Sequence, residues 1–230
     1  MVEIYATKIF AAEEYQLFKK ELLALVPEPS RRKINAFFRS SDAQRSLFGE
    51  LLIRRLICEK LNIRNKDLQI SFEDKGKPFI QNYPVHFNMS HSGVWVVAAI
   101  SAKPVGIDIE QMKRNRLEVA RRFFTEEEFQ DLMDTPEPDR TDHFYSLWTL
   151  KESYLKAVGR GLTLSLNSFA VKTEQGEYLI DINGIFAKMH LRIVPLESGY
   201  KLAVCASEPG ISQTVTLLPA NGYPDAFRNI

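Results

Sequence analysis

The chain has 230 residues, of which 45% are hydrophobic and 26% are charged, so it can build a real core and is not expected to be disordered. Its 30 lysine and arginine residues nearly balance its 29 aspartate and glutamate residues, which argues against a protein built mainly to grip nucleic acid or an anionic membrane. Cys58 and Cys205 lie in apolar runs and are expected to be buried free thiols. The sequence shows neither a signal peptide nor an apolar run that could span a bilayer, so the expected location is the cytoplasm.

The first half of the chain alternates between helices and strands. Its sequence pattern predicts, in order, a strand at 2–9, a helix at 11–26 closed by the prolines of 27–30, a helix at 41–62, a strand at 68–74, a turn at 75–78, a strand at 85–90, a turn at 91–93, and strands at 94–101 and 105–110. The strand at 94–101 is almost continuously apolar.

The second half repeats this order of helix and antiparallel strands. It predicts helices at 116–123 and 125–134, a proline-containing loop at 135–140, a long helix at 141–159, and hairpins at 167–182 and 189–207. The repetition indicates an internal duplication. We therefore predict an N-terminal half at 1–104, a C-terminal half at 105–208, and a tail at 209–230 that wraps the surface or frays.

The stretch KPVGIDIEQ at 103–111 places two carboxylates close together. Side chains alternate along a strand, so Asp108 and Glu110 project from one face while Ile107 and Ile109 project from the other. One interpretation is a half-buried strand with one wet face. The other is a pair of oxygen ligands for a divalent cation.

The long helix offers a third carboxylate. Trp148, Glu152 and Lys156 are spaced four residues apart and therefore share one helical face. An exposed Glu–Lys pair, which contributes only about 0.2–0.5 kcal/mol, is the alternative interpretation of this spacing.

Three stretches carry groups that suit phosphate oxygens. Ser90 and His91 stand at a turn, Lys77 lies between Gly76 and Pro78, and the basic run at 31–45 offers charge-assisted hydrogen bonds. Ordinary turn chemistry and a solvated charged face are the structural alternatives.

The stretch TEEEF at 125–129 has two interpretations. Thr125 and Glu128 have the spacing of a capping box, in which a helix is closed by reciprocal hydrogen bonds. Glu128 could instead be a catalytic carboxylate. The two roles require different directions of its side chain.

Four motifs, FNMSHSG, VGIDIE, RFFTEEEF and LWTLKESYLKAVGRGL, occur in this order along the chain. With them the chain resembles, over most of its length, the 4′-phosphopantetheinyl transferases of the surfactin-synthetase-activating type. The resemblance implies an α+β fold of two similar α/β halves in a pseudo-twofold arrangement, with antiparallel sheets and an active-site cleft between them. It also implies Mg²⁺-dependent transfer of the 4′-phosphopantetheine arm of coenzyme A to a serine of an apo acyl or peptidyl carrier protein, with release of 3′,5′-ADP.

The resemblance also implies roles for individual residues. The metal ligands would be Asp108, Glu110 and Glu152, holding Mg²⁺ or alternatively Mn²⁺. The coenzyme A contacts would be Lys33, Arg45, Ser46, Gly76, Lys77, Pro78, Ser90, His91, Asp108 and Lys156, with Lys33, Arg45 and Ser46 near the 3′-phosphate.

The attacking hydroxyl belongs to the carrier, so such an enzyme needs no nucleophile of its own. Glu152, Glu128 and a metal-bound water remain open as the base, and Lys156 adds positive charge. The carrier is expected to dock at about 159–190, where leucines stand beside Arg160, although these leucines could equally be core residues. A monomer that binds neither nucleic acid nor membrane is expected.

Two other functions fit the same residues. One is another metal-dependent phosphoryl enzyme, such as a phosphodiesterase, and the other is a non-catalytic module that binds carriers. Transfer to an apo carrier protein distinguishes all three.

Overall fold

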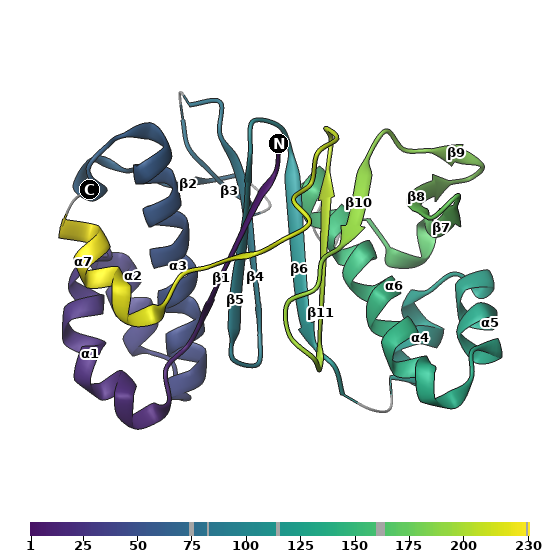
Figure 1. Ribbon diagram of the computed structural model, residues 1–230, viewed down its shortest axis with the longest axis horizontal. Coiled ribbons are helices and arrows are strands. Elements are labelled where there is room, and N and C mark those ends of the chain that lie inside the picture. Colours follow the sequence, from purple (N-terminus) through teal and green to yellow (C-terminus); the bar gives the residue numbers. More distant parts are fainter. Residues whose placement is uncertain (74–75, 82, 114–115, 160–163, 229) are drawn as a thin grey trace.

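A computed structural model describes the whole chain except residues 74–75, 82, 114–115, 160–163 and 229. Two α+β halves stand side by side, each with its sheet toward the middle of the molecule and its helices outside (Figure 1). The two cysteines are buried and free, as predicted.

The N-terminal half is a four-stranded sheet in the order β12-β1-β5-β4, covered on its outer face by helices. Its elements are β1 Glu3–Lys8, α1 Ala12–Ala24, α2 Glu28–Asn35, α3 Ser40–Leu61, β2 Ser71–Phe72, β3 Pro78–Phe79, β4 His86–Ser92 and β5 Trp95–Ser101, with short 3₁₀ turns between some of them. The predicted strand at 68–74 is reduced to β2, which pairs only with β3. Helix α3 is 22 residues long and packs its apolar face on β5.

The C-terminal half is built in the same way around a long helix and an antiparallel sheet in the order β6-β11-β10-β8-β7, with β9 beside β8. Its elements are β6 Val105–Gln111, α4 Leu117–Phe123, α5 Glu126–Asp134, α6 Glu137–Val158, β7 Ala170–Glu174, β8 Glu177–Ile182, β9 Ile185–Phe186, β10 His190–Ile193 and β11 Tyr200–Ala206. Helix α6 is also 22 residues long. The two halves therefore agree with the predicted duplication.

The two sheets pack face to face, and β5 explains why its sequence is almost continuously apolar. Every residue of β5 is buried. Val96 and Ala98 point into the core beneath the N-terminal helices, while Val97 and Ala99 point into a middle core shared with β6 and β11. Because side chains alternate along a strand, a strand between two cores is apolar on both faces.

Two proline-rich stretches begin helices, although we predicted that the first only ends a helix and that the second is a loop. Helix α2 starts within PEPS and α6 starts at Glu137, and each carries a proline in its first turn. The first turn tolerates proline because its amide has no partner inside the helix. The prediction of a loop at 135–140 was therefore wrong for most of that stretch.

The C-terminal tail does not fray. It crosses from β11 in front of both sheets to the N-terminal helices (Figure 1). There β12 Thr216–Leu217 pairs in parallel with β1, and α7 Tyr223–Arg228 buries Tyr223 and Phe227 in the N-terminal core. The aromatic side chains of the tail explain this docking, since burial of such a ring stabilises a fold by about 1.5–3 kcal/mol.

Gly106 sets how closely α6 approaches the sheet. A Cβ atom at this position would lie 2.1 Å from the carbonyl oxygen of Ser153 and 2.3 Å from the amide nitrogen of Ala157. Only glycine permits this contact between the α6 backbone and β6. The close approach brings the polar face of α6 beside the carboxylates of β6.

Candidate active site at the joint of the two halves

The three predicted metal ligands converge on one pocket of about 420 Å³ between the halves. Asp108 and Glu110 come from β6, and Glu152 comes from α6. The described residues that line the pocket are Met89, Ser90, His91, Asp108, Glu110, Trp148, Glu152 and Lys156. Strand alternation grouped Asp108 with Glu110, helical spacing grouped Glu152 with Lys156, and the structure brings the two groups together in this pocket.

Asp108 is the most buried of the three carboxylates, with 4% of its surface exposed. Its Oδ1 accepts hydrogen bonds from Lys156 Nζ at 2.6 Å and from Ser90 Oγ at 2.9 Å. Its Oδ2 is buried and accepts no hydrogen bond from any residue that the structure describes. A buried carboxylate oxygen without a donor is costly, and a cation bound in the pocket would remove that cost.

The pKa values of Glu110 and Glu152 lie above the ordinary value. For both side chains, burial is the main cause and the negative charge of Asp108 is the second. The positive charge of Lys156 acts in the opposite direction and lowers the pKa of both carboxyl groups. Three carboxylates and one ammonium leave the pocket with an excess of negative charge, which suits a divalent cation.

The donor set fits Mg²⁺, but the three carboxylates are not already arranged as a metal cage. Within the described part of the chain, no three acidic, histidine or cysteine side chains form a ready cluster. Lys156 and Ser90 occupy Asp108 Oδ1, and Ser92 Oγ donates to Glu110 Oε2 at 2.8 Å. Mg²⁺ typically takes only one or two protein carboxylates together with substrate phosphates and water, so a full cage of protein ligands is not required.

The predicted phosphate contacts lie partly at the same pocket. His91 lines this pocket. The pKa of its imidazole lies below the usual value, because burial desolvates the ring and because the positive charges of Arg45 and Lys156 are close. Arg45 on α3 donates to the carbonyl oxygen of Gly93 at 2.8 Å and pairs with Asp42. Ser46 follows it as a half-buried residue of α3, and Lys33 is exposed on α2.

Lys77 lies at the C-terminal end of α6. Its Nζ donates to the carbonyl oxygens of Lys156 at 2.8 Å and Ala157 at 2.9 Å. Burial lowers the pKa of its ammonium group. A cation at a helix C-terminus is favourable because the last carbonyls have no partner within the helix. The neighbouring Gly76 has φ +81° and Pro78 begins β3, so this loop holds the end of α6.

We expect Lys77→Met to lower the free energy of unfolding by about 1.5–3 kcal/mol, since two helix-terminal carbonyls lose a charged donor. Chemical denaturation measures this change, and Lys188→Met on the exposed surface is the control. An unchanged stability together with a weaker affinity for coenzyme A would instead favour a purely nucleotide-binding role.

Glu128 is not brought into the pocket. Both halves of the predicted capping box are present, with Thr125 N donating to Glu128 Oε2 at 2.9 Å. The carboxylate also accepts from Lys151 Nζ at 2.6 and 2.7 Å and from Val171 N at 2.8 Å. Glu128 is 3% exposed and its oxygens are occupied. The geometry therefore favours the capping box, and the expectation that Glu128 is catalytic is corrected.

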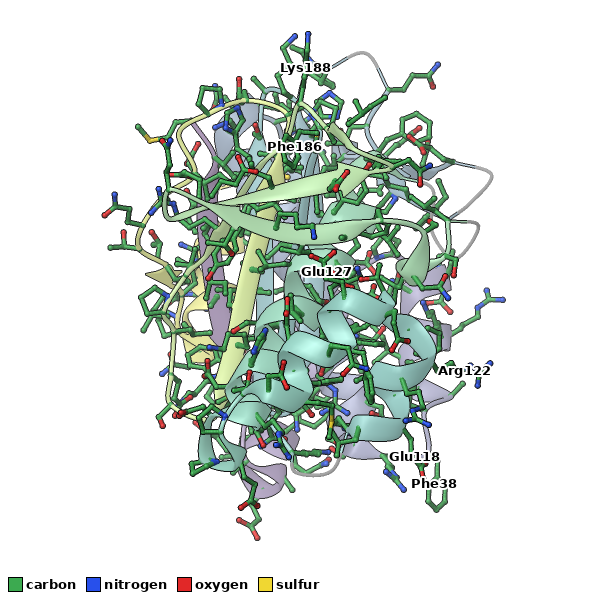
Figure 2. The ribbon with its side chains drawn as sticks, turned by 90° about the vertical axis from the view of Figure 1, so that its right-hand side faces the viewer. Phe38, Glu118, Arg122, Glu127, Phe186 and Lys188 are labelled. Atoms are coloured by element: carbon green, nitrogen blue, oxygen red, sulfur yellow. The ribbon has the colours of Figure 1, made fainter. Side chains whose placement is uncertain are left out.

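The region predicted to meet the carrier is only partly described. Arg160 and Leu162 lie outside the described residues. Leu166 is buried and Leu164 is half-buried against the C-terminal core, so the core interpretation holds for these two. Phe186 on β9 is 45% exposed, and Figure 2 shows it below Lys188 at the top of the view and above Glu127.

Comparison with known proteins assigns the family. Residues 104–205 match the 4′-phosphopantetheinyl transferase superfamily, and residues 14–103 match the N-terminal region of 4′-phosphopantetheinyl transferases. The chain is 36% identical over 217 residues to the 4′-phosphopantetheinyl transferase Sfp of Bacillus subtilis (strain 168), a match that covers 94% of this chain and 95% of that protein. The chain belongs to the 4′-phosphopantetheinyl transferases.

A second relative of this transferase supports the same family. The 4′-phosphopantetheinyl transferase gsp of Aneurinibacillus migulanus is 39% identical over 180 residues, covering 77% of this chain and 76% of that protein. A solved holo-(acyl-carrier-protein) synthase from Bacillus anthracis, in complex with coenzyme A, is 24% identical and covers 45% of this chain and 93% of that chain, with a TM-score of 0.37. The predicted family and its transferase activity are confirmed by the closer matches, and the α+β fold class is confirmed by the structure itself.

We expected Ser90 and His91 at a turn, but both lie within β4, and the row of polar side chains that Ser90 forms there with Asn88 and Ser92 was not predicted. Asn88 Oδ1 accepts from Ile107 N at 3.0 Å, Ser90 donates to Asp108, and Ser92 donates to Glu110. The signal was present in the sequence, since these residues alternate along the strand and so share one face. The sequence could not show that this face of β4 lies against β6 of the C-terminal half.

Finally, no helix in the described part of the transferase combines the length and the apolar character needed to cross a membrane.

Proposed function

We propose that this transferase moves the 4′-phosphopantetheine arm of coenzyme A to a carrier-protein serine at a Mg²⁺ site formed by Asp108, Glu110 and Glu152. The observation that supports this site most directly is the convergence of three carboxylates on one pocket, with the buried Asp108 Oδ2 facing no donor among the described residues. When bound, Mg²⁺ would neutralise charge on the pyrophosphate.

The residues of the chain itself bind and orient the reactants. Lys156 and His91 line the pocket and supply a positive and a hydrogen-bonding group to the phosphates of coenzyme A, and Arg45 lies close to His91. The carrier serine oxygen forms a bond to the β-phosphorus while the bond from that phosphorus to the 3′,5′-ADP oxygen breaks. Charge that develops on the phosphate oxygens is then stabilised by Lys156.

The serine must also lose its proton. Of the two glutamates that the sequence offers as the base, only Glu152 lines the pocket. Burial first and Asp108 second raise the pKa of its carboxylate above the ordinary value in the metal-free protein, and its place in the pocket makes it the glutamate available to the serine. We therefore assign proton acceptance to Glu152.

We also propose a partner-facing surface and a cellular setting. We place carrier docking on the described residues of 159–190, where the exposed Phe186 stands beside Lys188. An exposed apolar side chain beside a cation suits an acidic carrier helix. The protein would act as a monomer in the cytoplasm.

Incubation with coenzyme A, Mg²⁺ and several apo carrier proteins tests the proposal by intact mass. The carrier is expected to gain one phosphopantetheine, and neither a carrier whose serine is changed to alanine nor a reaction containing EDTA should gain it. Hydrolysis of a phosphodiester without transfer, or carrier binding without transfer, would contradict the proposal.

A further inference from the structure

Strands β4 and β6 are edge strands of different sheets, and side chains join them. In the described part of the molecule, β4 ends the N-terminal sheet and β6 ends the C-terminal sheet. Asn88 Oδ1 accepts from Ile107 N, and Ser92 Oγ accepts from Gln111 N at 3.0 Å. Two backbone amides of β6 are thus satisfied by side chains of β4, as edge strands require.

Ser92 differs from Asn88 because it also contacts a site residue. Its hydroxyl accepts from Gln111 N and donates to Glu110 Oε2 at 2.8 Å. A hydroxyl that accepts from a backbone amide has its proton directed elsewhere, here toward the carboxylate. Ser92 is absent from the described lining of the pocket, whereas Glu110 is part of it.

We propose that Ser92 is a positioning residue, which holds the Glu110 carboxylate in the orientation that binds the divalent cation. The inference rests on the proposed metal site. It makes cation binding depend on the alignment of the two halves, since the residue that orients the ligand comes from the N-terminal half and the ligand from the C-terminal half.

The expected loss of cation affinity in a Ser92 variant is taken from other groups that orient metal ligands. Loss of such a partner typically costs about 10–100-fold in metal affinity or activity. The opposing view is that Ser92 only completes the edge of β6, in which case its loss changes stability and leaves cation binding as it was.

The same hairpin offers a matched control. Ser101, at the other end of the β4–β5 hairpin, donates to Glu208 Oε1 at 2.8 Å and accepts from Lys103 N at 3.2 Å. Ser101→Ala therefore removes the same two kinds of hydrogen bond from the same hairpin, but away from the pocket.

The test is a Mn²⁺ titration of EDTA-treated protein in saturating coenzyme A, followed by the electron paramagnetic resonance of free Mn²⁺. Ser92→Ala should weaken Mn²⁺ binding by about 10–100-fold, while Ser101→Ala binds as wild type does and Ser92→Thr, which keeps the hydroxyl, restores most of the affinity. Melting temperatures in EDTA identify any variant that fails to fold.

Two results would overturn the inference, and they differ. If Glu110→Gln weakens Mn²⁺ binding but Ser92→Ala matches Ser101→Ala, then Ser92 only completes the strand edge and the metal site stands. If Glu110→Gln itself leaves Mn²⁺ binding unchanged, the proposed metal site fails and the role of Ser92 fails with it.

Discussion

Lys151→Met is expected to lower the free energy of unfolding by about 3–5 kcal/mol, because it leaves a buried carboxylate without its cation. Lys151 is 0% exposed, and its Nζ contacts both oxygens of Glu128 and the carbonyl oxygen of Phe169 at 2.6 Å. Burial lowers the pKa of this ammonium while Glu128 opposes the shift. Chemical denaturation measures this loss, and the slope of the free energy of unfolding against denaturant concentration should stay unchanged.

A surface ion pair that involves the neighbouring residue of α5 is the control. Lys172 on β7 pairs with Glu127 on α5, and their side chains are 29% and 64% exposed. Lys172→Met should cost less than about 1 kcal/mol, since exposed pairs contribute little. Similar losses for the two variants would contradict the assignment of Glu128 and Lys151 as a buried structural pair.

Mutation of Glu128, the acidic member of the buried pair, distinguishes a role in folding from a role in catalysis. Glu128→Gln should reduce the yield of folded protein, yet leave the turnover of each folded molecule close to wild type. Its carboxylate lies away from the pocket, so no substrate proton should reach it. A fall in turnover with unchanged stability would restore Glu128 as a catalytic residue.

Glu152→Gln is expected to reduce kcat by about 10²–10⁴-fold, the range of a lost general base, while stabilising the fold at neutral pH in EDTA. The pKa of Glu152 is raised above the ordinary value of 4.5 by burial and by Asp108. The folded protein therefore binds this proton more readily than the unfolded chain. That stabilisation is complete below the unfolded pKa and is lost as pH rises through the folded pKa.

The sign of the stability change follows. At neutral pH the charged Glu152 destabilises the fold relative to a neutral side chain, so Glu152→Gln should melt higher than wild type. Near pH 4 the difference should vanish, because wild-type Glu152 is then protonated. Thermal melts in EDTA at both pH values measure this, with Glu137→Gln in the first turn of α6 as the control. A lower melting temperature at neutral pH would show that Glu152 is structural.

Local periodicity predicted which side chains share a face of each element, because the residues of the candidate site lie on a regular strand and a regular helix. Alternation put Asp108 and Glu110 on one face of β6, and a spacing of four put Trp148, Glu152 and Lys156 on one face of α6. Both predictions hold, since all five line the pocket. Neither pattern could show that β6 and α6 touch, which depends on Gly106 and the close approach it allows.

What the sequence could not predict depends on contacts between distant segments. Lys77 and the end of α6 lie about eighty residues apart in sequence, and no local pattern relates them. The partner of Glu128 is Lys151, whose neighbour Glu152 faces the pocket while Lys151 faces the core. The proline-rich stretches were misjudged because proline favours both loops and the first turn of helices.

The most direct test of the proposed metal site is a crystal structure of the enzyme with coenzyme A and Mn²⁺, with anomalous scattering recorded from the metal. We expect one strong peak in the pocket, within direct coordination distance of Asp108, Glu110 and Glu152. A peak that lies away from these three carboxylates, or one that is unchanged in Asp108→Asn, would contradict the account.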